Sequence, residues 1–390
     1  MAVRNFTLVD ADSHIFEPPA IWERYLDGEY RVLARSVFWY EEDPDGLATI
    51  IVNGKPAKPM NQGVINRQAI WRPGMTPEQI GALDPKKPHP INPGAQDPER
   101  RLKDMDALGV DKAVLFPTLF AEYFPVVENP DVAYALSRAY NSWVHDWCRA
   151  NPDRLLPAAV LPLQDIRFAI REAERVSGLG FKAAFLRPSF FQEKFLTHPS
   201  YDPLWKRLEV LGLTACIHPS PGNANPEWTS EGSFVERVAA NLQIGHNVAE
   251  SVAPMMDNAT AFTAFAFCGQ MENFPKLKVM YCHGGASWLH VALEKAENYL
   301  TVFSYLPDIT LEQGEVFFDR PSMLTFDTWE APILVPLQDL HANVTAWGSR
   351  YPNHDAPPPS EAIEALEQAG ASGEFIAKVM GANAARLYGL

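Results

Sequence analysis

Eight short apolar segments recur along this chain, and each has the length of a β-strand rather than that of a buried helix. Amphipathic stretches separate them, for example at residues 98–110, 165–180 and 201–212, where apolar residues recur at helical spacing. A near-continuous apolar run is typical of a parallel strand that is buried on both faces. The segments span residues 6–12, 112–119, 155–162, 181–188, 213–220, 277–285, 323–329 and 344–350.

This alternation of strand-like and helical segments determines the predicted fold class. Eight strand–helix units in a row are typical of a (β/α)8 barrel, or TIM barrel, in which helices surround a closed parallel sheet. An open doubly wound sheet is the alternative, but the first strand lacks the G-x-G-x-x-G turn of dinucleotide-binding sheets. We therefore predict an α/β protein with a single TIM-barrel domain over residues 1–390.

Two long insertions interrupt the predicted barrel. Residues 28–97 follow the first strand and contain aromatic residues, a possible hairpin around Asn53 and Gly54, and a Pro-rich end. We expect this segment to form a lid or an arm. Residues 221–276 lie between the fifth and sixth strands and look mostly helical. Connections of this length are usually functional, so both insertions are expected to have a functional role.

Composition narrows the range of partners and locations. The formal net charge of -15 argues against a phosphate-binding surface, which needs clustered Lys and Arg, so no nucleic-acid partner is expected. No apolar run is long enough to span a bilayer and no signal peptide is visible, so no membrane association is expected. The four cysteines show no C-x-x-C spacing, which favours a reduced, cytoplasmic protein.

Polar residues gather where the predicted strands end, which is the end of a TIM barrel that carries the chemistry. Asp12 and His14 close the first strand and share a face, because residues two apart on a strand point the same way. His218 ends the fifth strand, and His283 ends the sixth. Imidazole and carboxylate ligands from separate strands suit Zn, Mn or Fe, so these residues predict a metal site. Taken singly, each could instead be a turn cap or a buried structural histidine.

Further polar residues extend this predicted site. Glu17 lies just beyond the first strand and can fold back as a ligand. His246, in the helical insertion, can reach over the site as a ligand or as an acid or base, although a surface position fits the sequence equally well. Asp327 ends the seventh strand and is a candidate catalytic residue, whereas Asp10 lies one layer deeper and is expected to be structural.

The motifs at these strand ends resemble those of the amidohydrolase-related superfamily of metal-dependent TIM barrels. The similarity covers nearly the whole chain and includes its decarboxylase and hydrolase branch. It is carried by D-x-H at residues 12–14, H-P-S at 218–220, H-G-G-A-S-W at 283–288 and G-S-R-Y-P at 348–352. The resemblance implies a decarboxylase or hydrolase with one Zn or Mn ion.

Arg350 departs from the family pattern, which has an aspartate here that binds the metal and orients or deprotonates the attacking water. An arginine cannot act as a base, because its guanidinium stays protonated. The resemblance then implies that hydrolytic chemistry is lost, or that His354 or Asp355 becomes the catalytic replacement. Arg350, and Arg187 at the end of the fourth strand, could bind a substrate carboxylate, although a salt-bridged role is equally compatible.

With the added carboxylate of Glu17 and no aspartate at position 350, the pattern resembles that of a smaller group. These are the TIM-barrel nonheme di-iron monooxygenases typified by the hydroxylase of platensimycin and platencin biosynthesis. This resemblance implies two Fe ions that activate O2 and hydroxylate a bulky, terpenoid-like acyl group, which could be linked to CoA. The implied ligands are Asp12, His14, Glu17, His218, His246 and His283.

An iron-dependent monooxygenase, an oxidoreductase of secondary metabolism, is therefore the main functional prediction. A mononuclear Zn or Mn decarboxylase or hydrolase is the alternative, and a non-enzymatic binding barrel is the third hypothesis. Related barrels are often dimers, so a homodimer is expected.

Overall fold

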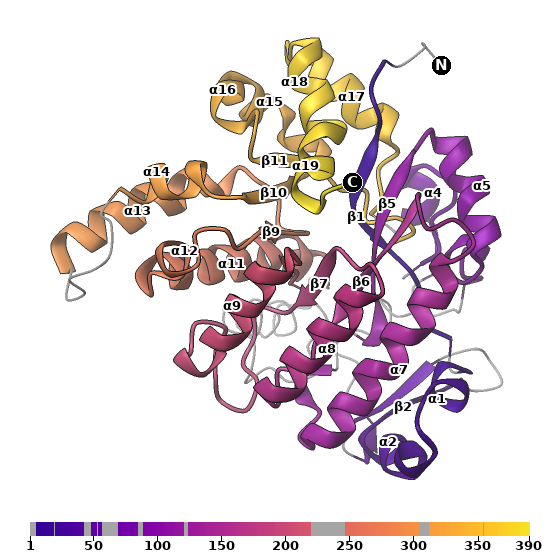
Figure 1. Cartoon of the computed structure of the whole chain (residues 1–390). Coiled ribbons are helices and arrows are strands. Elements are labelled where there is room, and N and C mark those ends of the chain that lie inside the picture. Colours follow the sequence, from indigo (N-terminus) through magenta and orange to yellow (C-terminus); the bar gives the residue numbers. More distant parts are fainter. Residues whose placement is uncertain are drawn as a thin grey trace.

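The structure is a computed structural model that describes residues 5–18, 20–42, 48–52, 54–56, 69–84, 89–120, 124–219, 246–303, 312–353 and 355–390. Eight strands form one sheet in the order β1-β5-β6-β7-β8-β9-β10-β11, and every neighbouring pair is parallel (Figure 1). Helices between the strands complete a (β/α)8 barrel, so the predicted fold class is confirmed. The strands are β1 (Val9–His14), β5 (Lys112–Phe116), β6 (Leu155–Val160), β7 (Ala183–Leu186), β8 (Thr214–Ile217), β9 (Val279–Tyr281), β10 (Ser322–Phe326) and β11 (Thr345–Trp347).

The first strand and the segment after the last strand are joined by hydrogen bonds. The Arg350 amide donates to the carbonyl of Asp12 at 2.7 Å, and the Ser349 amide donates to Oδ1 of Asp10 at 2.9 Å. Burial raises the pKa of the Asp10 carboxyl, although the Ser349 donors oppose this shift. Asp10 is buried and has the structural role that its depth in the barrel suggested.

The helices begin and end where the local sequence satisfies their free backbone groups. The carboxylate of Asp97 accepts hydrogen bonds from the first amides of α5, as an N-cap residue does. The same helix ends at Gly109 and α9 ends at Gly212, with φ values of 73° and 66° that glycine adopts readily.

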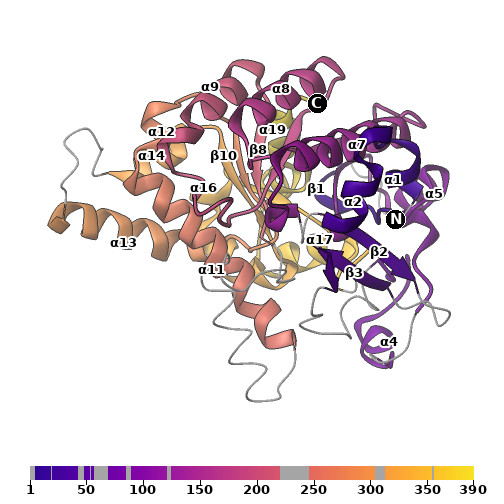
Figure 2. The same cartoon turned by 90° about the horizontal axis from the view of Figure 1, so that it is seen from below.

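Figure 2 shows the strands in the middle of the molecule with helices around them. The larger barrel helices are α5 (Pro98–Leu108), α7 (Pro130–Cys148), α8 (Ile166–Gly178), α9 (Asp202–Leu211), α13 (Trp288–Phe303) and α17 (Pro359–Gln368).

The two insertions add smaller elements. The first contains a three-stranded antiparallel sheet, and the pairing of Val52 with Lys55 places a hairpin where one was expected, around Gly54. The described part of the second insertion consists mainly of α11 (His246–Phe267) and α12 (Gln270–Asn273). The other elements are α1 (Ala20–Arg24), α2 (Arg31–Val37), β2 (Phe38–Glu42), β3 (Ala48–Val52), β4 (Lys55–Pro56), α4 (Pro77–Gly81), α14 (Gln313–Asp319), α15 (Ala331–Leu334), α16 (Gln338–His341), α18 (Gly373–Ala377) and α19 (Asn383–Tyr388). Short 3-10 turns lie between some of them, and a π-helical turn (Lys378–Ala382) joins α18 to α19.

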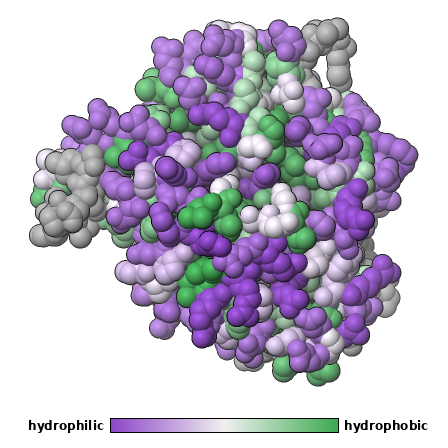
Figure 3. Space-filling model, in the orientation of Figure 1, coloured by the Kyte–Doolittle hydropathy of each residue, from purple (hydrophilic) through white to green (hydrophobic). Residues whose placement is uncertain are grey.

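The core lies inside the barrel and between the strands and their helices. Phe116, Trp205, Tyr281 and Trp347 are among its largest fully buried side chains. The face of the molecule in Figure 3 is mostly hydrophilic, as expected for the outward sides of a helical layer. In the described part of the chain, no helix combines the length and apolar character that crossing a bilayer requires.

Candidate metal centre

Three imidazoles meet at the carboxyl end of the barrel. His14 ends β1, His218 directly follows β8, and His283 lies two residues beyond β9. The ring centroids of His14 and His218 are 5.1 Å apart, and those of His218 and His283 are 5.2 Å apart. One ring nitrogen from each residue lies within 4.8 Å of the other two. Two ligands of a zinc-sized ion lie roughly 3–4 Å apart, so this cluster is close to the spacing that a metal site needs.

Backbone carbonyls fix the orientation of two of these rings. Nδ1 of His14 donates to the carbonyl of Pro117 at 3.0 Å, and Nδ1 of His218 donates to the carbonyl of Pro219 at 2.7 Å. A carbonyl oxygen can only accept, so in the neutral rings the proton is on Nδ1 and Nε2 presents a lone pair. Metal-binding histidines are commonly oriented in this way.

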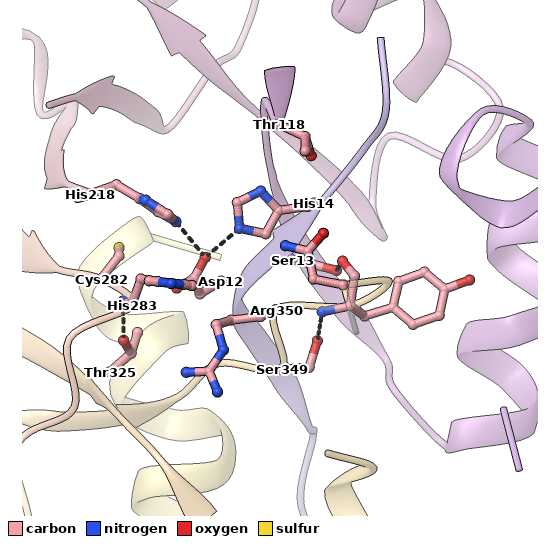
Figure 4. Close-up of polar contacts among 12 residues, drawn as sticks. Asp12, Ser13, His14, Thr118, His218, Cys282, His283, Thr325, Ser349 and Arg350 are labelled. Carbon is pink, nitrogen blue, oxygen red and sulfur yellow. Dashed lines mark hydrogen bonds and ion pairs between the residues drawn. The ribbon is translucent and has the colours of Figure 1, made fainter. Parts of the chain in front are cut away.

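Both Nε2 atoms face the carboxylate of Asp12. Oδ1 of Asp12 lies 3.2 Å from Nε2 of His218 and 3.4 Å from Nε2 of His14 (Figure 4). Although burial alone would raise the pKa of Asp12, His218 and His14 hold this pKa well below its ordinary value. Lone pairs and a carboxylate in such contact are stable only when a cation lies between them, either an added proton or a metal ion.

Several buried polar atoms at this point make no hydrogen bond within the described part of the chain. They are Oδ2 of Asp12, Nε2 of His14 and Nδ1 of His283. Leaving such an atom unsatisfied costs about 1–3 kcal/mol, and a metal ion would remove that cost. Burial, followed by the charges of Arg350 and His218, lowers the pKa of His283 to about 3, so its ring is neutral at pH 7 and able to act as a ligand. The residues present therefore fit a bound metal.

The structure does not bring Glu17 into this cluster. Its carboxylate accepts hydrogen bonds from the amides of Thr118, Leu119 and Phe120, at 2.9, 3.0 and 3.2 Å. Burial raises the pKa of Glu17 to about 7, although these amides oppose the shift. Glu17 thus anchors the segment that follows Pro117, whose carbonyl orients His14. The sequence showed that Glu17 is near the end of β1, but it did not show that backbone donors of another loop surround it.

Arg350 is held between two carboxylates. Its Nη1 donates to Oδ1 of Asp327, and its Nε lies 2.8 Å from Oδ2 of Asp355. The ring of Trp329 lies 5.6 Å from the guanidinium carbon. Burial raises the pKa of Asp327 to about 6, although Arg350 lowers it. Because its charge is balanced locally, Arg350 is compatible with a cation at the neighbouring imidazoles.

Glu330 is a functional candidate that the sequence analysis missed. Its carboxylate accepts hydrogen bonds from the amides of Ala286, Ser287 and Asp327. It therefore fastens the loop that carries His283 to the loop that carries Asp327. The sequence feature that could have identified Glu330 is the D-x-x-E spacing from residue 327 to residue 330, which is typical of a capping box.

The remaining predicted site residues stay untested. Arg187 is buried directly after β7. His246 begins α11, but its side chain lies outside the described part of the structure. His354 also lies outside the described residues. The catalytic roles predicted for Asp327, His354 and Asp355 remain predictions.

The fold and the site together define a class, the (β/α)8 barrels with a candidate metal centre at the carboxyl ends of their strands. Within it, the chain belongs to the amidohydrolase family, whose profile matches residues 87–390. The chain is 34% identical over 181 residues to gamma-resorcylate decarboxylase of Rhizobium sp., covering 38% of this chain and 54% of that protein. It is 26% identical over 209 residues to 2-amino-3-carboxymuconate-6-semialdehyde decarboxylase of Dictyostelium discoideum, covering 53% of each. The chain thus spans about half the length of these curated relatives.

Solved structures share the fold over almost the entire chain. An amidohydrolase from Mycobacterium avium subsp. paratuberculosis superposes with a TM-score of 0.79 at 20% identity, covering 100% of this chain and 99% of that one. The 5-carboxyvanillate decarboxylase of Sphingomonas paucimobilis gives 0.68 at 18% identity, covering 99% and 100%. The dihydroxybenzoic acid decarboxylase of Polaromonas sp. JS666, solved with bound manganese and 2-nitroresorcinol, gives 0.65 at 16% identity, covering 99% and 97%.

These relatives correct the functional prediction. The predicted nonheme di-iron monooxygenase, with its oxidoreductase chemistry, is wrong, because the relatives are decarboxylases. The structure supplies a physical reason, since Glu17, the added carboxylate that suggested a second iron, is engaged by backbone amides. The alternative prediction, a mononuclear Zn or Mn enzyme of the decarboxylase or hydrolase type, agrees better with these findings.

Proposed function

We propose that this protein is a metal-dependent decarboxylase that acts on a small carboxylic acid of the hydroxybenzoate type. The observation that carries the proposal is the convergence of three imidazoles on one buried site, with Asp12 against two of them. The decarboxylase relatives, one of them solved with manganese, support it. Their substrates are small acids, and no observation supports the acyl-CoA partner that was predicted. The whole chain acts as one domain in this proposal, with residues 28–97 as its lid.

The proposed cofactor is one Mn or Zn ion. Asp12, His14 and His218 would hold it, and His283 would complete the set. When bound, the ion supplies positive charge that attracts an acidic substrate and withdraws electrons from it. Nδ1 of His14 and Nδ1 of His218 stay bonded to backbone carbonyls, so both rings are oriented before the substrate arrives.

Decarboxylation breaks the bond between the substrate carbon and its carboxylate. Carbon dioxide leaves, the electron pair remains on the substrate carbon, and that carbon takes up a proton. We assign the donor role to Asp327, because burial raises its pKa to about 6 and a fraction of this carboxyl is protonated near neutrality. Arg350, already paired with Asp327, stabilises the carboxylate that the proton transfer creates. Asp327 then regains its proton from solvent, and no oxidant is consumed.

The test is carbon dioxide release by Mn-loaded protein from 2,6-dihydroxybenzoate, 5-carboxyvanillate and related hydroxybenzoates. We expect release at the same rate with and without oxygen, and its loss in His218→Ala. Release that requires oxygen, or no release from any acid while the protein holds one metal per chain, would contradict the proposal.

A further inference from the structure

A cavity of about 740 Å³ opens beside the ion pair between Arg350 and Asp355. Its walls come from residues 71–80 of the first insertion, residues 328–332 after β10 and residues 355–369 after β11. Segments that follow the strands of a (β/α)8 barrel form the face that carries the active site. The lining residues at 328–332 and 355–358 follow β10 and β11 directly and so lie toward the carboxyl end of the barrel, as the candidate metal centre does.

The walls of this cavity are mainly apolar. Trp71, Met75 and Ile80 line it from the first insertion, and Trp329 lines it from the segment after β10. The charged residues among its lining are Asp355 and Glu361, and no Lys or Arg side chain of the described residues lines it. Ligand sites commonly have volumes of about 300–1,000 Å³ and mostly apolar walls. This cavity fits an uncharged apolar group and disfavours an anion.

The exposure of Trp329 also favours a ligand in this cavity. Its side chain is 65% exposed, although it borders the apolar cavity and lies next to the buried guanidinium of Arg350. An aromatic ring of this size gains free energy when another ring covers it. A flat ring in the cavity would provide that cover.

The cavity borders an ion pair that belongs to the proposed catalytic cluster. Asp355 lines it, and Oδ2 of this residue is 2.8 Å from Nε of Arg350. Arg350 pairs with Asp327 through Nη1, and its amide donates to the carbonyl of Asp12 at 2.7 Å. One ion pair thus separates the cavity from the groups to which we assign the chemistry.

We propose that this cavity binds an uncharged aromatic ring that the substrate carries in addition to its reacting acid group. The inference rests on the proposed function and specifies its substrate class, a carboxylic acid with a second, unreactive apolar ring. Single-ring hydroxybenzoates would then fill only the part of the site at the metal centre. Their KM would be higher than that of an acid that carries the second ring.

Binding of 2-naphthol to the full-length, Mn-loaded protein tests the cavity without any need for activity. Titration calorimetry gives its affinity, and naphthalene-2-sulfonate is the anionic control with the same rings. Ala365→Phe fills the cavity from α17, whereas Ser360→Phe adds the same ring at an exposed position of that helix outside the lining. We expect 2-naphthol to bind at least tenfold more tightly than the sulfonate. Ala365→Phe should weaken 2-naphthol binding at least tenfold, and Ser360→Phe should leave it unchanged.

Equal affinity for the two compounds, or unaltered 2-naphthol binding in Ala365→Phe, would overturn the inference. If Ala365→Phe does not fold, Trp329→Ala provides the second variant, and weaker binding is again expected. A hydroxybenzoate bearing a second ring then links binding to turnover, since Ala365→Phe should raise its KM and leave that of a single-ring acid unchanged. If no acid is decarboxylated, the proposed function fails, but the binding result still decides whether the cavity takes an aromatic ring.

Discussion

Glu330 accepts two hydrogen bonds from Ser287, one from the amide at 2.9 Å and one from the hydroxyl at 2.6 Å. The contact joins the loops that follow β9 and β10. Gly285, within the first loop, packs so closely on this carboxylate that an added Cβ would lie 2.7 Å from Oε1 of Glu330. The position of His283, two residues before Gly285, therefore depends on a side chain of the neighbouring loop.

Replacing Glu330 by Gln should lower activity without unfolding the protein. A neutral amide cannot accept all the amide hydrogen bonds that this carboxylate accepts, so the His283 loop loses its fixed position. Outer partners of metal sites typically contribute about 10- to 100-fold to activity or metal affinity, and we expect a loss in this range. Steady-state kinetics and Mn titration measure it, with Glu364→Gln, on the exposed side of α17, as the control. Full activity in Glu330→Gln would contradict the positioning role.

The proton-donor role of Asp327 predicts how the rate depends on pH. Burial raises the pKa of this carboxyl to about 6, and the donor must carry its proton. The fraction of active enzyme, and with it kcat, should fall about tenfold per pH unit above roughly pH 6. Asp327→Asn should remove most of the activity. A rate that stays constant from pH 6 to pH 8 in the native protein would exclude this role.

Gly348 should be required for a working metal centre. An added Cβ at this position would lie 2.6 Å from Cβ of Asp12, which is too close for either residue to stay in place. We expect Gly348→Ala to lower the melting temperature and to weaken Mn binding at least tenfold. Gly178→Ala is the matched control, because a Cβ there meets nothing within 4 Å and the substitution suits a helix. If both variants bind Mn like the native protein, the packing argument for Asp12 is wrong.

The pair formed by His290 and His341 should make the fold sensitive to acid. Their Nε2 atoms are 2.9 Å apart, and Nδ1 of His341 lies 2.8 Å from Oγ1 of Thr345. Burial, followed by the charge of His290, lowers the pKa of His341 to about 4. The unfolded chain therefore binds more protons between pH 6.5 and pH 4, so the free energy of unfolding falls as the pH falls through this window. The loss is on the order of 3 kcal/mol.

Thermal unfolding at a series of pH values measures this effect. His341→Gln should flatten the decrease in melting temperature below pH 6.5, whereas His198→Gln, at an exposed site, should keep it. An unaltered pH dependence in His341→Gln would refute the assignment.

Much of the fold could be predicted because burial on both faces gives parallel strands a distinct apolar pattern. The predicted strand at residues 155–162 corresponds to β6 (Leu155–Val160) and the one at 112–119 to β5 (Lys112–Phe116). The predicted sixth strand runs too far, since it reaches residue 285 whereas β9 ends at Tyr281. His283 adopts a φ of 61°, and the chain leaves the sheet there. Apolar content alone does not reveal such a backbone change.

The imidazole cluster could be predicted because its residues lie at or just beyond the ends of strands. Asp12 and His14 could be paired from a spacing of two, and His218 from its place at a strand end. The hydrogen-bond partners of Glu17, the amides after β5, could not be predicted because they are about a hundred residues away in the sequence. Glu330 was missed for the same reason, since its main contacts lie on another loop.

The most direct test of the central claim is the number and identity of metal ions per chain, measured by elemental analysis after equilibration with Mn, Zn and Fe together. We predict one Mn or Zn ion per native chain, and none in the double variant His14→Ala/His218→Ala. Two Fe ions per native chain, or an unchanged metal content in the double variant, would contradict the claim that Asp12, His14, His218 and His283 hold one Mn or Zn ion.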